Sequence, residues 1–178
     1  AVLAEVEKTT DLSQNLTDYM IKVSAYCSQK EEEKIAALHP QDVIVSADTI
    51  VVIDGKILGK PKDEQDAARM LRLLSGRTHT VYTGLTVHAN GKANTQVVST
   101  GVTFRDLSDA EIAAYIETKE PMDKAGAYGI QGRGRLLVSG IEGDWANVAG
   151  LPVARVVREL EMLLGTQDLV VRCLGTRD

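Results

Sequence analysis

The chain has 178 residues, a formal net charge of −5, 44% hydrophobic residues and only 4% aromatic residues. This content suffices for one sizeable aliphatic core with up to two lobes, which suits an α/β protein and disfavours a β-sandwich. The acidic balance disfavours general binding to nucleic acid or to an anionic membrane surface. No apolar run reaches about 18 residues, no signal-peptide pattern occurs and the two cysteines lie far apart. We therefore expect a soluble protein of the cytoplasm.

The first part of the chain is expected to form a short strand and a helix. Residues 2–6 read as a strand that ends beside Glu7. A helical stripe of apolar residues predicts a helix from Thr17 to Leu38. The three glutamates at 31–33 are expected to be its solvated face.

A polar tetrad, Ser46-Ala47-Asp48-Thr49, separates two β-branched runs at 43–46 and 50–53 that read as buried strands. An ionised carboxylate inside such a run costs several kcal/mol unless it is paired or binds a metal. Asp48 therefore has two interpretations. It caps a turn or closes a structural ion pair, or it stands at the mouth of a cleft and holds a metal or accepts a proton.

Turn and cap residues predict the next elements. Asp54-Gly55 suits a type I′ hairpin turn with a return strand at 56–58. Asp63 is a good N-cap for a helix that Gly76 ends. The helix would bury Ala67, Met70, Leu71 and Leu74.

A second hairpin turn at Asn90-Gly91 joins predicted strands at 79–89 and 94–104. Ser108 and Glu111 form a capping box at the start of a short helix. That helix would bury Ile112, Tyr115 and Ile116.

The last third of the chain contains a glycine-rich segment at 124–135. A strand at 135–138, a turn at Ser139-Gly140 and a final helix from Pro152 to Gly165 are expected to follow. The apolar stripe of that helix comprises Val153, Val156, Val157, Leu160, Leu163 and Leu164.

Polar residues cluster at the expected strand ends and in the glycine-rich turn. They are Glu7, Asp48, Lys60, Lys62, Asp63, Lys124, Gln131 and Arg133. Two carboxylates can share Mg²⁺, and lysines with loop N–H groups can bind phosphate, which together suit hydrolysis of a phosphoryl bond. The alternatives are solvated lysines, an edge-strand charge at Glu7 and a loop tip at Gln131.

Two common nucleotide-binding patterns and a histidine metal site are not supported. The glycine-rich segment fits neither the Walker pattern nor a G-x-G-x-x-G turn after a strand. His39, His79 and His88 lack ligand spacing and are expected on the surface or in strands.

Several motifs occur in one order from about Glu5 to Leu164. They are Ser46-Ala47-Asp48-Thr49, Gly59-Lys60-Pro61, Leu74–Gly84, Lys119–Gly132 and Glu142-Gly143-Asp144 with Asn147–Pro152. In this order they resemble the Maf family, the septum-formation-inhibitor homologues. Several motifs in one order are far more specific than any one of them.

The resemblance implies a nucleoside triphosphate pyrophosphatase that is related to the inosine-triphosphate pyrophosphatases. Such an enzyme cleaves between the α and β phosphates with Mg²⁺ or Mn²⁺ and releases a nucleoside monophosphate and pyrophosphate. The implied fold is an elongated mixed β-sheet with flanking helices and two lobes around a cleft. The motif Gly129-Ile130-Gln131-Gly132 is similar to the branch that acts on dTTP and UTP.

The resemblance also implies roles for residues. Asp48 matches the proton acceptor, and Thr49 and Gln131 match positions that shape base choice. Polar cleft positions are matched by Glu7, Lys30, Lys60 and Lys124. In the implied mechanism, Glu7 and Asp48 hold the metal that polarises the α-phosphate, Asp48 positions or deprotonates water, and the lysines offset charge on the phosphates.

One family feature is missing. Family members open with a Ser-x-Ser-Pro-Arg-Arg segment on a phosphate-binding loop, which this sequence lacks. We expect that segment upstream of Ala1 and residues 1–178 to form one domain, with a homodimer suggested by the family. The alternative function is a nucleotide sensor or cell-division regulator on the same fold, without useful turnover.

Overall fold

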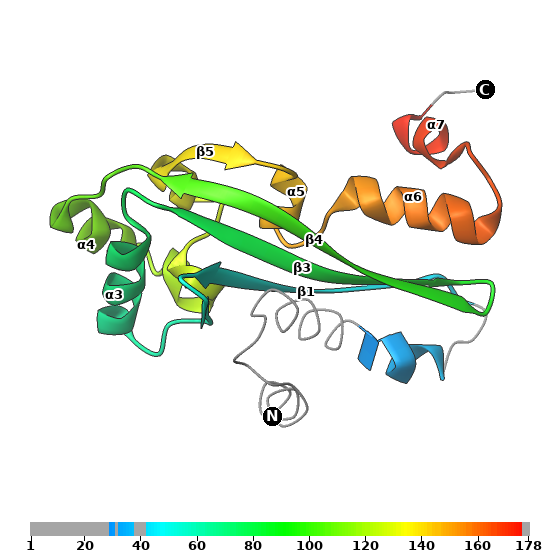
Figure 1. Ribbon diagram of the computed structural model, residues 1–178, viewed down its shortest axis with the longest axis horizontal. Coiled ribbons are helices and arrows are strands. Elements are labelled where there is room, and N and C mark those ends of the chain that lie inside the picture. The colour runs from blue at the N-terminus through cyan, green and yellow to red at the C-terminus, as the bar shows by residue number, and fades with distance from the viewer. Residues whose placement is uncertain (1–28, 31, 38–41, 176–178) are drawn as a thin grey trace. The chain divides into compact units, whose positions relative to one another are not determined.

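The computed structural model describes residues 29–30, 32–37 and 42–175, and Figure 1 shows their arrangement. Helical residues 29–30 and 32–36 come first. The later elements are β1 (Ile44–Ile53), β2 (Lys56–Leu58), α3 (Glu64–Leu74), β3 (Thr78–Ala89), β4 (Lys92–Phe104), α4 (Asp109–Glu117), the 3₁₀ helices η1 (Glu120–Asp123), η2 (Ala125–Ala127) and η3 (Arg133–Leu137), β5 (Val138–Glu142), α5 (Trp145–Val148), α6 (Val153–Leu164) and α7 (Leu169–Leu174).

The five strands form one sheet in the order β2-β1-β3-β4-β5, and helices flank it, which confirms the α/β class. The strand pairs β1–β2 and β4–β5 are antiparallel. Two compact units divide the chain. The first contains Ala1–Asp48, Gly84–Val97 and Leu151–Asp178, and the second contains Thr49–Thr83 and Val98–Gly150. The predictions of one domain and of a cleft between two lobes stay predictions.

Both predicted hairpin turns are confirmed. Asp54 and Gly55 have φ of 48° and 70°, and Asn90 and Gly91 have 53° and 69°. Two successive positive φ angles are typical of a type I′ turn, whose twist matches that of the flanking strands. The first turn sets the register of β1 on β2, in which Val51 faces Leu58 and Ile53 faces Lys56.

β1 is one continuous strand of 10 residues, so the prediction of two separate strands was wrong. Its first half is largely exposed, whereas its last four residues, Ile50–Ile53, are buried. A polar tetrad does not interrupt a strand whose side chains there reach solvent, because the backbone ladder is independent of side-chain polarity.

The second unit has its own core. Helices α3 and α4 pack against each other beside the sheet (Figure 1). The Asp63 side chain accepts from the Asp66 N–H at 2.8 Å and so caps α3, as predicted. The Ser108–Glu111 capping box is also present at α4. The predicted stripes of both helices are buried in this core.

The segment after the glycine-rich loop differs from its prediction. Residues 133–137 form η3, and Ser139 and Gly140 lie inside β5, where a turn was predicted. Gly140 pairs with Thr103 of β4, and Val102 pairs with Ile141. An available strand edge on β4 has overridden the local preference of a Ser-Gly pair for a turn.

A smaller core in the first unit joins β3 to α6. Leu85, Val87 and Val156 are buried there, and Leu160 and Leu163 pack against them. Helix α6 begins after Pro152 and ends at Gly165, as predicted. Of its predicted stripe, Val153 and Leu164 are exposed, because they lie at the two ends of the helix. None of the described helices is long and apolar enough to cross a membrane.

Two histidines of β3 are buried, so their strand position is confirmed and a surface position was wrong. His79 Nε2 lies 2.8 Å from the Tyr128 hydroxyl, while Nδ1 is buried and has no partner among the described residues. The rings of Phe104 and Tyr128 meet the His79 ring edge-on at 5.2 and 5.4 Å. Burial lowers the pKa of His79 from 6.5 to about 4.

This burial predicts a pH dependence of stability. From pH 6.5 down to about 4 the unfolded chain protonates His79 and the folded chain does not, so the free energy of unfolding falls with pH by up to about 3 kcal/mol. His79→Phe should flatten that part of the profile in urea denaturation measured across this range. Tyr128→Phe, which removes the same hydrogen bond and keeps the histidine, should retain the slope. An unchanged slope in His79→Phe would contradict the assignment.

Candidate functional site

The glycine-rich loop is held by one carboxylate, that of Glu120 in η1. Its Oε2 accepts from the backbone N–H of Arg133 at 2.8 Å, and its Oε1 accepts from that of Gly134 at 3.0 Å. Oε1 also accepts from the Tyr115 hydroxyl at 2.9 Å. The Tyr115 oxygen in turn accepts from the Gly129 N–H at 3.1 Å. Both ends of the loop are thereby attached to α4 and η1.

The close approach of this carboxylate explains two of the glycines. A Cβ on Gly132 would lie 2.5 Å from the Glu120 carboxyl group. A Cβ on Gly134 would lie 2.6 Å from the Gly129 carbonyl oxygen and 2.7 Å from the Tyr115 hydroxyl. Atoms at such distances overlap, so a side chain at either position would push the loop off its anchor.

The same contacts shift the pKa values of Glu120 and Tyr115. Burial raises the pKa of Glu120, but the Gly134 and Arg133 N–H groups and the Tyr115 hydroxyl outweigh it, so the net pKa is lowered. Burial, together with the neighbouring Glu120 charge, raises the pKa of Tyr115. Glu120 is therefore an ionised acceptor and Tyr115 a protonated donor near neutral pH.

Gln131 lies on this anchored loop and is exposed, between residues whose backbone is held. The loop therefore presents the Gln131 amide to solvent on a supported backbone. An amide can donate and accept hydrogen bonds at once. Its predicted role in base choice stays a prediction.

A backbone hydrogen bond joins the two segments that carry the predicted residues Lys60 and Lys124. The Gly126 N–H donates to the Gly59 carbonyl at 3.1 Å, which joins the segment before Lys60 to the segment after Lys124. Lys124 Nζ lies 2.6 Å from Asp123 Oδ1. The hydrogen bond from Lys124 lowers the pKa of Asp123, and the Lys60 charge contributes to the same shift. The Gly59–Gly126 hydrogen bond thus places the segment that carries Lys60 next to the segment that carries Lys124.

Thr49 belongs to a chain of hydroxyl and amide groups. Its Oγ1 lies 2.8 Å from Thr83 Oγ1, and Thr83 Oγ1 donates to the Asn147 carbonyl at 3.3 Å. The buried Asn147 amide donates to Thr100 Oγ1 at 2.9 Å. The Thr100 hydroxyl donates to the Asp144 carbonyl at 3.1 Å. The half-buried Thr49 is therefore attached to the body of the second unit.

Asp48 does not carry the desolvation cost that the sequence suggested, because it is exposed on β1. That part of the prediction was wrong, since the first half of the strand is not a buried run. An exposed carboxylate beside the half-buried Thr49 remains accessible to water and to a ligand.

The remaining predicted site residues lie in the first part of the chain. Lys30 is exposed and pairs with Glu33 at 2.9 Å, one helical turn away. The expectation of a solvated glutamate run was wrong for Glu32, which is 5% exposed. Glu7 lies outside the described residues. The described residues contain no group of three or more metal-binding histidine, cysteine or carboxylate side chains.

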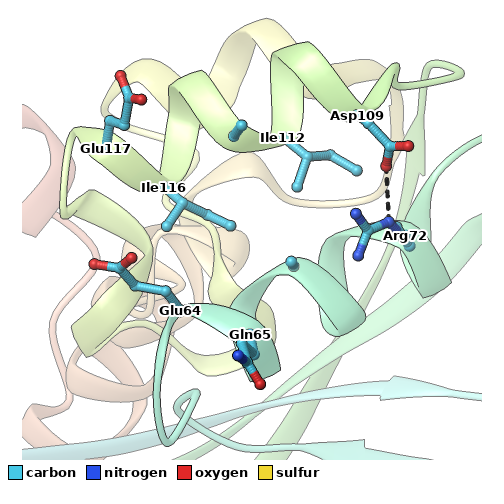
Figure 2. Close-up of a pocket in the computed structure, with 9 residues that line it drawn as sticks. Glu64, Gln65, Arg72, Asp109, Ile112, Ile116 and Glu117 are labelled. Carbon is cyan, nitrogen blue, oxygen red and sulfur yellow. Dashed lines mark hydrogen bonds and ion pairs between the residues drawn. The ribbon is translucent and has the colours of Figure 1, made fainter.

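A pocket of about 430 Å³ lies between α3 and α4 and is separate from these residues (Figure 2). Ile112 and Ile116 face it, and the Arg72–Asp109 ion pair of 2.8 Å closes one side. Of the predicted site residues, the six that the structure describes do not line this pocket. It therefore adds nothing to the predicted site.

Glu120, Tyr115, Thr83 and Asn147 had no predicted role in the site. Glu120 lies inside the motif Lys119–Gly132, but its hydrogen bonds join residues that are 5 to 14 positions apart. Local spacing does not reveal such contacts. The run of glycines was the only sign that a polar group approaches the backbone closely.

The chain is similar to known proteins over most of its length. Residues 2–163 match the family model described as Maf-like protein. A dTTP/UTP pyrophosphatase of Bacillus pumilus is 53% identical over 136 residues, 76% of this chain and 72% of that protein. One of Bacillus cytotoxicus is 46% identical over 160 residues, 90% of this chain and 82% of that protein. One of Bacillus velezensis is 51% identical over 134 residues, 75% of this chain and 71% of that protein.

The Glu120 anchor predicts a stability effect centred on the loop. Glu120→Gln replaces one acceptor oxygen by a donor that faces backbone N–H groups, and should lower the free energy of unfolding by about 1–3 kcal/mol. Hydrogen exchange at residues 129–134 should accelerate more than elsewhere. Glu117→Gln, at an exposed position of α4, serves as the control and should change neither quantity. Equal exchange in both variants would refute the anchor.

Proposed function

Because this chain belongs to the Maf family, we propose that it is a pyrophosphatase that hydrolyses dTTP and UTP to the monophosphate and pyrophosphate. Relatives that bear the name dTTP/UTP pyrophosphatase are 43–53% identical over most of the chain, which supports this substrate pair. Modified pyrimidine triphosphates are included among the proposed substrates.

The observation that carries the proposal is the placement of Lys124, which Asp123 holds at 2.6 Å directly before the glycine-rich loop, while the Gly59–Gly126 hydrogen bond joins the residue before Lys60 to the same segment. A triphosphate brings several negative charges, and ammonium groups on two neighbouring segments would offset them. Asp123 keeps Lys124 in place through a hydrogen bond. An entering phosphate would compete with that carboxylate for the same ammonium group.

Divalent Mg²⁺ or Mn²⁺ is part of the proposal, held by Asp48 and Glu7. Mg²⁺ keeps several waters and is usually bound by one or two carboxylates plus substrate phosphates, without a cage of protein ligands. An exposed Asp48, with no larger carboxylate cluster among the described residues, fits that requirement. When bound, the metal would neutralise charge on the phosphates.

In the proposed reaction, Asp48 orients the attacking water and accepts its proton. Water adds to the α-phosphorus, and the bond from that phosphorus to the oxygen bridging the β-phosphorus breaks. Lys60, Lys124 and Lys30 offset the charge that develops on the phosphates. Thr49 and Gln131 contact the base. We place this activity in the cytoplasm, in a protein of one domain that forms a homodimer.

Removing the proposed base should abolish most turnover. Asp48→Asn keeps the shape of the side chain and should lower kcat for dTTP by on the order of a hundredfold or more. Stability should change little, because the residue is exposed. Asp109→Asn, an exposed aspartate that pairs with Arg72, is the control and should retain wild-type turnover. Pyrophosphate release measures both.

Two outcomes would overturn the assignment. Wild-type turnover in Asp48→Asn would remove Asp48 from the chemistry. Tight binding of dTTP by the unmodified chain, with no pyrophosphate released in the presence of Mg²⁺, would favour a nucleotide sensor.

The proposed phosphate-binding role of Lys60 and Lys124 predicts an effect on substrate binding. Lys60→Gln and Lys124→Gln should each raise KM for dTTP roughly tenfold, because each removes one charge that faces the phosphates. Lys119→Gln is the matched control. Lys119 is an exposed lysine in the same segment as Lys124, and it pairs with Glu64. If all three variants raise KM equally, net charge and not the position of the lysines would be responsible.

A further inference from the structure

A second cavity, of about 320 Å³, lies beside α4 and η3. Its wall includes the buried side chains of Tyr115 and Leu137 and the exposed Ala114. Leu136, also in the wall, is 67% exposed, so a ligand in the cavity would cover apolar surface that now contacts water. Sites for small molecules are mostly apolar and usually measure about 300–1,000 Å³, which suits a small ligand at this cavity better than a macromolecule.

The cavity wall has one positive charge available to a ligand. Arg105 pairs with Glu111 at 2.7 Å and donates through Nε to the Leu136 carbonyl at 2.6 Å, so the charges of the pair offset each other. The Arg133 guanidinium has no hydrogen bond or ion pair with any described residue. Glu120 accepts from the Arg133 backbone, but it does not line the cavity and its oxygens already accept three hydrogen bonds.

These features select one class of ligand. A singly charged carboxylate matches one guanidinium, whose planar fork can donate two parallel hydrogen bonds to it. A doubly charged phosphate would bring its second charge near Glu111, which lines the same cavity. We propose that this cavity binds a small carboxylate with an aromatic or aliphatic body. The body lies against Leu136 and Leu137, and the carboxylate pairs with Arg133.

Two residues of the cavity wall also hold the glycine-rich loop. The Tyr115 hydroxyl accepts from the Gly129 N–H at 3.1 Å, and the Arg133 N–H donates to Glu120 at 2.8 Å. A ligand that binds only when Tyr115 and Arg133 are in place favours this arrangement of the loop. Hydrogen exchange at the Gly129 and Arg133 N–H groups should therefore slow when the cavity is occupied. This site goes beyond the proposed function, and its ligand needs no turnover of dTTP.

Cinnamate is the probe, because it joins a carboxylate to a planar apolar body, and the neutral cinnamamide is its matched control. NMR titration of the full chain measures the dissociation constant of each compound. Arg133→Gln removes the charge and keeps the backbone N–H that Glu120 accepts. It should weaken cinnamate binding roughly tenfold and leave cinnamamide within about twofold. Arg135→Gln, at an exposed position of η3 outside the cavity wall, should change neither compound.

A second variant tests where the compounds bind. Ala114→Trp places a large side chain at an exposed position of α4 that lines the cavity, so the helix should still fold. The affinity of both compounds should fall roughly tenfold, because the indole ring occupies their space.

Four outcomes would overturn the inference. They are no saturable binding of cinnamate to the unmodified chain, an equal loss of affinity in Arg133→Gln and Arg135→Gln, unchanged binding in Ala114→Trp, and exchange at residues 129–134 that cinnamate does not slow. Pyrophosphate release from dTTP is measured separately. A chain that binds cinnamate as expected but releases no pyrophosphate would refute the proposed function and leave this site supported.

Discussion

A single carboxylate organises the loop on which the candidate site depends. Glu120 accepts two backbone N–H groups and the Tyr115 hydroxyl, and that hydroxyl oxygen accepts a further N–H from Gly129. A glycine-rich segment loses much conformational entropy when it is ordered. An ionised acceptor compensates better than a neutral one, since hydrogen bonds to charged groups contribute about twice as much. The exposed Gln131 therefore lies on a backbone that hydrogen bonds hold on both sides, at Gly129 and at Arg133.

The polar groups of the second unit divide the proposed work. We propose that Lys124 and Lys60 bind phosphate without regard to the base. We propose that Thr49, which is joined to the Asn147 carbonyl through Thr83, contacts the base. Affinity and specificity would thus come from different contacts, and a variant of one group should leave the other intact.

The sequence correctly predicted the elements that depend on residues close together in the chain. The turns at Asp54 and Asn90 and the caps at Asp63 and Ser108 depend on residues a few positions apart. The predictions failed where a distant partner decides. β5 forms where a turn was expected because β4 offers an edge, and two histidines that were expected on the surface or in strands are buried in a strand. The exposure of Asp48 was also missed, since periodicity does not tell which half of a long strand is covered.

By itself, the sequence determined the α/β class, the two hairpins, the helix caps and the family, because each depends on nearby residues or on motif order. Tertiary structure alone decided that Glu120 anchors the glycine loop, that the Gly126 N–H reaches the Gly59 carbonyl, and that Thr49 contacts Thr83. These are contacts between residues far apart in the chain. Their energies depend on distances of a few tenths of an ångström and on the direction of single protons, and spacing along a sequence contains neither.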